Sequence, residues 1–214
     1  MVVLGLTLAS SRAADLVFTV VGTAHDSRYG YAAGEQATFV FVLDGDFTSV
    51  TSTFSSTFMQ WSDRSSSPLL VKSITGGGLT GTFDPPTSPS ASLTAEKDFN
   101  DFAFDGATLD FPGTIGLFTP NGTGLNSIGF TFVEFVNGWT FSGTPETPEA
   151  FLAGHLGAVD VGTESFIRLA VVPGSGLLDF DVTSATISSV PEPSTWALLG
   201  VAAVGLCGWR RSRS

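Results

Sequence analysis

The side chains that most often carry out catalysis are scarce in this chain of 214 residues. It has two histidines, His25 and His155, and a single cysteine, Cys207. The sequence contains no Gly-x-Ser-x-Gly elbow, no His-Glu-x-x-His pair, no P-loop and no dinucleotide-binding fingerprint. A Ser-His-Asp triad assembles from distant positions, so it stays open, but no spacing indicates one. We therefore expect no catalytic residues and no enzyme activity, with a secreted hydrolase as an alternative.

Clustered carboxylates suggest a second chemistry, because Ca²⁺ prefers about six to eight oxygen ligands. The weak candidates for such a metal site are Asp98, Asn100, Asp101 and Asp105 in "DFNDFAFDG", and Asp44 with Asp46. Neither cluster has the spacing of an EF-hand loop. Asp and Asn also form hydrogen bonds to their own backbone in turns. We favour turn chemistry and expect no cofactor, with calcium as the alternative.

Glu134 is unusual because it lies among large apolar residues in "FTFVEFV". Burial there would shift the pKa of the carboxylate. A bulge or an edge position would instead turn the side chain to solvent. A pair of facing carboxylates of the glycosidase kind cannot be identified from sequence.

Exposed aromatic rings would provide a surface on which sugars stack. The candidates are Trp61, Trp139, Tyr29 and Tyr31. Trp139 follows a turn signal at Asn137-Gly138 and is equally explained as a core residue. A carbohydrate-binding module, calcium-dependent or not, is therefore the alternative to a structural or adhesive protein.

The charge of the chain differs sharply between its body and its tail. Between Ala14 and Ser189 there are nineteen acidic and five basic side chains, a net charge of −14. An acidic body repels nucleic-acid phosphates, so we expect no nucleic-acid partner. The body also has no cysteine, which leaves no disulfide framework.

The composition favours an all-β fold, because β-branched and aromatic residues suit pleated surfaces and Gly, Pro, Ser and Asn form turns. Expected strands are 15–24, broken at Gly22, 37–46, 127–136, 165–173 and 176–187, with an edge strand or loop at 47–58. Expected hairpins turn at Gly76–Gly78 and at Asp105-Gly106, and a further turn lies at Asn121-Gly122. Residues 84–98 read as a loop, and 147–157 as a short helix. This pattern predicts a single antiparallel β-sandwich at 14–189, jelly-roll or immunoglobulin-like.

The first residues, "MVVLGLTLASSRAAD", combine an apolar stretch with small side chains. Ser11 and Ala13 occupy positions −3 and −1 of a signal-peptide cut after Ala13. The positive n-region is missing, so we expect residues 1–13 to be part of a secretory leader that starts upstream of Met1. A short buried strand is the alternative.

The last residues, 190–214, read as a sorting tail with three parts. Pro191-Glu192-Pro193 is followed by Ser194 and Thr195, then by fourteen uncharged residues at 196–209. As a helix these fourteen would span about 21 Å, which is short for a hydrocarbon core of about 30 Å. The basic side chains Arg210, Arg211 and Arg213 come next, and they predict a cytoplasmic end. We expect a short transmembrane helix, inserted only transiently in the inner membrane.

The order of these three parts resembles the PEP-CTERM sorting signal of exported proteins in Gram-negative bacteria. The resemblance covers only the tail. It implies that an exosortase, a membrane transpeptidase, recognises the chain and cleaves it near Pro191–Pro193. It also implies delivery to the cell surface or to the exopolysaccharide matrix of a biofilm. The expected partners are thus an exosortase and, as an alternative for the body, an exopolysaccharide.

Overall fold

The computed structural model describes most of the region between the predicted leader and the predicted tail. The described residues are 14–43, 50–55, 58–63, 71–83, 92–96, 106–112, 116–133, 155–159, 161–162, 164–171 and 176–190. The secondary-structure elements assigned in this part of the chain are all β-strands. This confirms the predicted all-β, antiparallel fold.

Thirteen strands are assigned in the part of the chain that the structure describes. They are β1 (Asp15–Ala24), β2 (Gln36–Leu43), β3 (Val50–Phe54), β4 (Phe58–Asp63), β5 (Val71–Gly76), β6 (Thr80–Gly81), β7 (Ser92–Glu96), β8 (Gly106–Pro112), β9 (Leu117–Phe118), β10 (Leu125–Val133), β11 (Gly157–Val159), β12 (Phe166–Val171) and β13 (Leu177–Val190).

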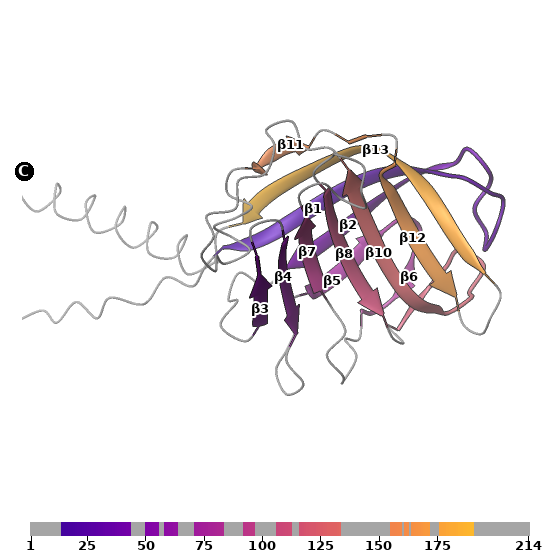
Figure 1. Ribbon diagram of the computed structural model, residues 1–214. Coiled ribbons are helices and arrows are strands. Elements are labelled where there is room, and N and C mark those ends of the chain that lie inside the picture. The colour runs from indigo at the N-terminus through magenta and orange to yellow at the C-terminus, as the bar shows by residue number, and fades with distance from the viewer. Residues whose placement is uncertain are drawn as a thin grey trace, which may run out of the picture.

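One antiparallel sheet contains eleven of these strands. Figure 1 shows how they are arranged. Ten of them form the path β3-β4-β7-β8-β10-β12-β13-β1-β2-β5, and β11 pairs with β13 off this path. The last strand of the domain therefore lies beside the first. The short strands β6 and β9 form a separate pair.

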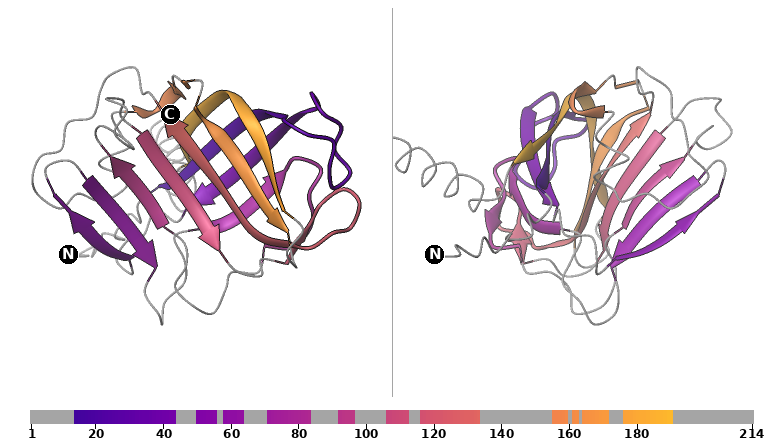
Figure 2. Two further views of the ribbon diagram at one scale, coloured as in Figure 1. Left: turned by 45° about the vertical axis from the view of Figure 1, so that its right-hand side comes forward. Right: turned by 90° about the vertical axis from the view of Figure 1, so that its left-hand side faces the viewer.

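The sheet folds over so that its two halves face each other. Figure 2 shows β1, β2 and β5 in one layer and β4, β7, β8 and β10 in the other. Phe130 of β10 contacts rings of the opposite layer, with its centroid 5.4 Å from that of Phe18 on β1 and 4.6 Å from that of Phe41 on β2. The hydrophobic core lies between these layers.

The bend in the sheet occurs within β13. Its first residues, Leu177–Asp181, pair with β12, and Phe180–Val190 pair with β1. Val21 faces Ser184 and Gly22 faces Val182, so Thr183 is an extra residue in the ladder. Such a bulge bends the strand and increases its twist. The hydroxyl of Thr183 donates to the carbonyl of Val21 at 3.3 Å, which satisfies that polar group.

Alternating side chains explain why the two longest paired strands form. Every second residue of β1, from Leu16 to Ala24, is buried. In β13 the buried positions are Leu178, Phe180 and Val182 before the bulge and Ala185 and Ile187 after it. The bulge thus returns apolar side chains to the core despite the extra residue.

Several predicted strands have the observed bounds within a few residues. β1 coincides with the predicted 15–24, and it continues through Gly22, where the prediction had a break. The ladder shifts its register at that point instead. The predicted edge strand is confirmed, because β3 lies at one end of the described sheet. The turn at Asn121-Gly122 is also confirmed, with Gly122 at a φ of 81°.

Three predictions about the middle of the chain were wrong. Residues 84–98 are not wholly a loop, because β7 occupies 92–96 within it. A turn does occur at Gly76–Gly78, but it is not a hairpin, since β5 pairs with β2 and β6 pairs with β9. The predicted hairpin turn at Asp105-Gly106 is misplaced, because Gly106 is the first residue of β8 and pairs with Glu96 of β7. Most of the predicted helix at 147–157 lies outside the described residues, and Gly157 begins β11.

Within the described residues, no helix is long and apolar enough to cross a membrane. The predicted helix at 196–209 lies outside them, as does the predicted leader. Both remain predictions.

Replacing Phe130 with alanine should remove the ring that contacts both Phe18 and Phe41 across the core. We expect a loss of about 3–5 kcal/mol in the free energy of unfolding, measured by denaturant titration. The control is Phe54→Ala on β3, whose side chain is 40% exposed. It should cost about 1 kcal/mol or less. Equal losses for the two variants would contradict the assigned core.

Candidate functional site

The β1–β13 ladder has two ends with different properties. At one end Asp15 pairs with Val190, and at the other Ala24 pairs with Phe180. We call the first, Asp15–Val17 with Ser188–Val190, the tail end. We call the second, comprising residues 24–35, 76–79, 119–124 and 176–177, the far end. β1 has ten residues, so the two ends lie about 30 Å apart.

The tail end joins the domain directly to the predicted sorting tail. β13 continues to Val190, and Pro191 is the next residue in the sequence. Both strand termini meet here, as the left side of Figure 1 shows for β1 and β13. An ion pair fixes the start of β1, with Nζ of Lys72 2.6 Å from Oδ1 of Asp15. The predicted leader and the predicted tail therefore connect to the same end of the domain.

The far end is held together by the loop between β1 and β2. The backbone N–H of Ala24 donates to the carbonyl of Glu35 at 2.9 Å, and that of Gly34 donates to the carbonyl of Ala24 at 2.8 Å. Tyr31 in this loop is buried, and its ring meets Phe180 edge-on at 5.0 Å. Its hydroxyl donates to the carbonyl of Gly77 at 2.7 Å. Tyr31 thus connects the loop to the core and to the turn after β5.

The turn at Gly76–Gly78 requires glycine for two reasons. Its three residues have φ angles of 89°, 60° and 74°, in the left-handed region that favours glycine. A Cβ on Gly77 would also overlap the ring of Phe39. The turn can therefore pass directly over this buried ring.

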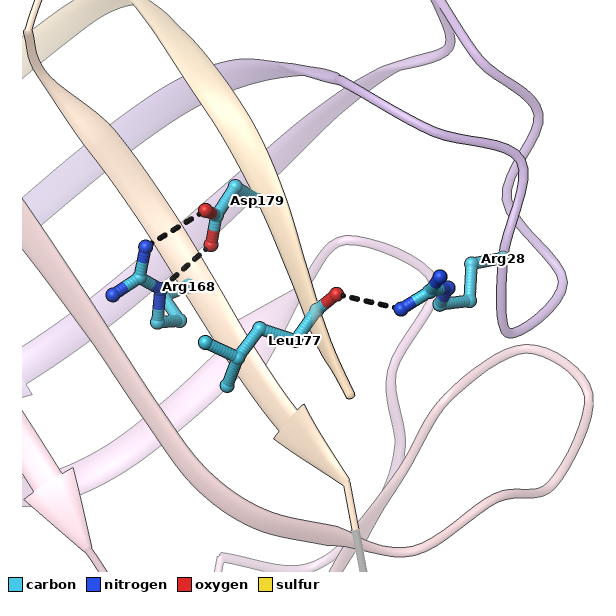
Figure 3. A network of polar contacts seen from close by, with 4 residues as sticks. All are labelled: Arg28, Arg168, Leu177 and Asp179. Atoms are coloured by element: carbon cyan, nitrogen blue, oxygen red, sulfur yellow. Dashed lines mark hydrogen bonds and ion pairs between the residues drawn. The ribbon is translucent and has the colours of Figure 1, made fainter. Parts of the chain in front are cut away.

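Arg28 and Tyr29 extend the contacts of the far end to β13. Nη1 of Arg28 donates to the carbonyl of Leu177 at 3.1 Å, as Figure 3 shows. The hydroxyl of Tyr29 donates to the backbone carbonyl of Gly176 at 3.2 Å. Tyr29 has a φ of 56°, which a non-glycine residue seldom adopts. The backbone N–H of Asn121 donates to its carbonyl at 3.3 Å. These bonds hold Tyr29 in a strained conformation.

A bidentate ion pair connects β12 and β13 beside this cluster. Nε and Nη2 of Arg168 each donate to Asp179 at 2.8 Å (Figure 3). The hydrogen bond to Asp179 raises the pKa of the Arg168 guanidinium above its ordinary value. The guanidinium also lies 4.7 Å from the centroid of the Phe166 ring. Both side chains are partly exposed, and Arg168 lies directly opposite Asp179 in the β12–β13 ladder. The ion pair is therefore explained as an ordinary cross-strand contact.

The two histidines do not form a recognisable catalytic arrangement. Nδ1 of His25 lies 3.7 Å from Oδ2 of Asp181, longer than a hydrogen bond, and both side chains are 67% exposed. A catalytic base is usually held by a close, buried partner. His155 is half-buried just before β11, far from His25 along the chain. His25 thus lacks such a partner among the described residues, and the secreted hydrolase stays an alternative from the sequence.

The predicted sugar-stacking rings have different outcomes. Tyr31 is 4% exposed, so its assignment to an exposed platform was wrong. Its ring is needed in the core, where it packs on Phe180. Tyr29 is half-buried, which leaves part of its ring accessible. Trp61 lies on β4, but the structure does not describe its side chain. Trp139 lies outside the described residues.

The weak calcium-ligand candidates, the unusual Glu134 and the predicted sorting residues lie outside the described residues. The calcium candidates are Asp44, Asp46, Asp98, Asn100, Asp101 and Asp105, and the sorting residues are Pro191, Glu192, Pro193, Ser194, Thr195, Arg210, Arg211 and Arg213. The described part of the chain contains no group of three His, Cys, Asp or Glu residues that could hold a metal ion. Calcium binding at the candidate residues stays the alternative to turn chemistry.

Sequence reasoning missed Arg28, Gly77 and the pairing of Asp15 with Val190. Arg28 is a surface residue by type and Gly77 a turn residue, and only the fold shows which carbonyl or ring each one meets. The Gly-Gly-Gly run did indicate a turn, although it gave no sign of the ring beneath it. Nothing local to either terminus indicates that the two ends of the domain lie side by side.

Comparison with known families gives a match at the tail. Residues 189–212 match the PEP-CTERM protein-sorting motif. This range includes Pro191, Glu192, Pro193, Ser194, Thr195, Arg210 and Arg211, and Arg213 lies just beyond it. The motif indicates an exported protein that an exosortase processes, which confirms the resemblance of the tail. Comparisons with curated proteins and with solved structures found no match to the chain.

Gly77→Ala should destabilise the domain more than Gly34→Ala. Both residues have positive φ, so each substitution costs about 1–2 kcal/mol of backbone strain. A Cβ on Gly34 has no atom within 4 Å, whereas one on Gly77 would also displace Phe39. We expect an additional loss of about 1–3 kcal/mol for Gly77→Ala in denaturant unfolding. A smaller loss than that of Gly34→Ala would show that the turn does not lie on Phe39.

Tyr31 should make the stability of the domain fall at alkaline pH. Burial, with a smaller contribution from the negative charge of Glu35, raises the pKa of the Tyr31 hydroxyl above its ordinary value. In the unfolded chain tyrosine ionises near about pH 10. The stabilising effect is therefore complete below pH 10 or so and is lost as the pH rises above it.

We expect Tyr31→Phe to cost about 1 kcal/mol below pH 10, because the hydrogen bond to Gly77 is lost. Above that pH, the gap between the two proteins in the free energy of unfolding should narrow. The chain has two tyrosines, so a Tyr29→Phe background isolates the absorbance of Tyr31. Ionisation of Tyr31 at its ordinary pKa in the folded protein would contradict this assignment.

Proposed function

We propose that this chain is exported cargo that is released from the inner membrane at its tail. The predicted leader would direct secretion, and the predicted helix at 196–209 would hold the chain in the membrane for a time. An exosortase would then cleave near Pro191–Pro193 and pass the domain to the cell surface or the extracellular matrix of a Gram-negative bacterium. The observation that carries the proposal is the match of residues 189–212 to the PEP-CTERM protein-sorting motif.

The position of the tail end is consistent with this route. The predicted leader cut after Ala13 falls two residues before Asp15, the first residue of β1. Asp15 pairs with Val190, the last residue before the proline motif. Both processing sites would thus lie at one end of the domain, next to the membrane. Removal of either segment would leave every described strand intact.

The same arrangement would direct the far end away from the membrane. The ladder between the two ends is about 30 Å long, so the loops at 24–35 and 119–124 would extend well beyond the lipid surface. The strained Tyr29 lies in this region, and the exposed Phe118 directly precedes the loop at 119–124. A structural or adhesive role for the β-sheet domain, without catalysis, would use this outward end.

We place the domain in the β-sandwich class on the basis of its facing layers. The support is the contact of Phe130 with Phe18 and Phe41 across the core. Eleven of the described strands form one folded sheet, with β3 and β5 at its two ends. The jelly-roll or immunoglobulin-like subtype stays a prediction.

Replacement of Pro191, Glu192 and Pro193 by alanine should leave the chain uncleaved in the inner membrane. The two prolines keep the motif extended, and the substitutions would let the predicted helix continue through it. Cell fractionation and the mass of the chain would measure the outcome. We expect accumulation of the full-length form in the membrane fraction and loss of the surface form.

A matched control is available in "TPETPE" at 144–149, which has similar residue types in the body of the chain. Pro145→Ala, Glu146→Ala and Pro148→Ala together should leave cleavage and surface release unchanged. Normal release of the variant altered at 191–193 would overturn the proposal.

A further inference from the structure

The last three residues of β13 are packed less firmly than the rest of the strand. Ser188, Ser189 and Val190 are all exposed, and Val190 is 50% exposed. The alternation of buried and exposed side chains along β13 therefore ends at Ile187. Because these three residues bury little apolar surface, only backbone pairing holds them in place.

That pairing is one-sided in the part of the chain that the structure describes. β12 pairs with Leu177–Asp181 of β13, and β11 pairs with Ala185–Ile187. Beyond Ile187 the paired strand is β1 alone, through Asp15–Val17. A strand segment with one partner and exposed side chains opens at low cost in free energy.

The opposite strand is fixed much more firmly. Leu16 is fully buried and also pairs with Leu43 of β2. Asp15 is held by its ion pair with Lys72 of β5. Opening of the tail end should therefore release Ser188–Val190 and leave β1 in place.

The sequence leaves little distance between the folded ladder and the membrane. Five residues, 191–195, separate Val190 from the predicted helix, and they span at most about 18 Å when extended. An enzyme that binds an extended peptide pairs with its backbone N–H and C=O groups. In the folded domain, some of the backbone N–H and C=O groups of Ser188–Val190 already pair with β1.

We propose that the three pairs Asp15–Val190, Leu16–Ser189 and Val17–Ser188 open before the tail is cleaved, so that Ser188–Val190 become part of the peptide that the processing enzyme binds. This inference rests on the proposed function, because it concerns the same cleavage. The folded domain thereby sets the rate of its own release. Unfolding of the core is not required, since the bulge at Thr183 and the buried Ile187 both precede the opened segment, and Ile187 stays paired with β1.

A reversible cross-link across the tail end tests this inference in the full chain. Asp15→Cys with Val190→Cys places two cysteines directly opposite each other on antiparallel strands, within reach of a disulfide. The control is Thr19→Cys with Thr186→Cys, an opposed pair deeper in the same ladder. All variants carry Cys207→Ser, so that the new pair provides the only thiols.

Cleavage is followed by mass in inner membranes that contain the exosortase, with each variant first oxidised and then reduced. The oxidised tail-end variant should be cleaved at least about tenfold more slowly than its reduced form, because the three pairs cannot open. Oxidation of the deeper control should change its rate less than about twofold. Comparison within one variant removes any effect of losing the ion pair between Asp15 and Lys72.

An insertion separates this explanation from a general effect of the cross-link. Six Gly and Ser residues placed between Val190 and Pro191 give the enzyme an extended peptide outside the ladder. In the oxidised tail-end variant this insertion should restore the rate of cleavage.

Equal rates for the oxidised and reduced tail-end variant would overturn the inference, as would equal slowing by both cross-links or failure of the insertion to restore cleavage. Absence of cleavage in the Cys207→Ser parent would instead overturn the proposed function, and the inference with it.

Discussion

The pairing of the first strand with the last is the constraint on which the rest of this structure depends. β1 and β13 pair from Asp15–Val190 to Ala24–Phe180, and this ladder connects the strands on either side into one sheet. The bulge at Thr183 lets β13 pair with β12 in one layer and with β1 in the other. A purely regular strand would turn Ala185 and Ile187 to solvent, because one extra residue reverses the faces of a strand. The core between the layers, with Phe130 against Phe18 and Phe41, follows from that bend.

The same ladder separates two ends of the domain that differ in packing. At the far end Tyr31, Phe180 and Phe39 close the core beneath the Gly76–Gly78 turn, and the loops at 24–35 and 119–124 meet through a backbone hydrogen bond from Asn121 to Tyr29. At the tail end, burial decreases over the last three residues of β13 just before the proline motif. Stability is thus concentrated away from the place where the proposed cleavage would occur.

The sequence predicts the strands better than it predicts their partners. The alternation of apolar residues predicted both ends of β1, Asp15 and Ala24, correctly, because that pattern is local and strong. The partner of a strand depends on contacts far along the chain, so the hairpin at Gly76–Gly78 was wrong although its turn was right. One signal went unused: the apolar residues of β13 change from even to odd positions between Val182 and Ala185, which indicates the bulge. For the tail, three adjacent parts in a fixed order identify the motif without any fold. The described structure adds where that tail begins.

Amide hydrogen exchange of the folded full-length chain would test the central claim most directly. The claim is that the β1–β13 ladder is the stable frame of the domain and that its tail end opens on its own. Paired amides between Leu178 and Ala185 should exchange only when the whole domain unfolds, whereas those of Ser188–Val190 should exchange by local opening at a much lower free energy. The paired amides of β1 at Phe18–Val20 should remain protected. Equal protection along all of β13, or exchange of the whole ladder by local opening, would contradict the account.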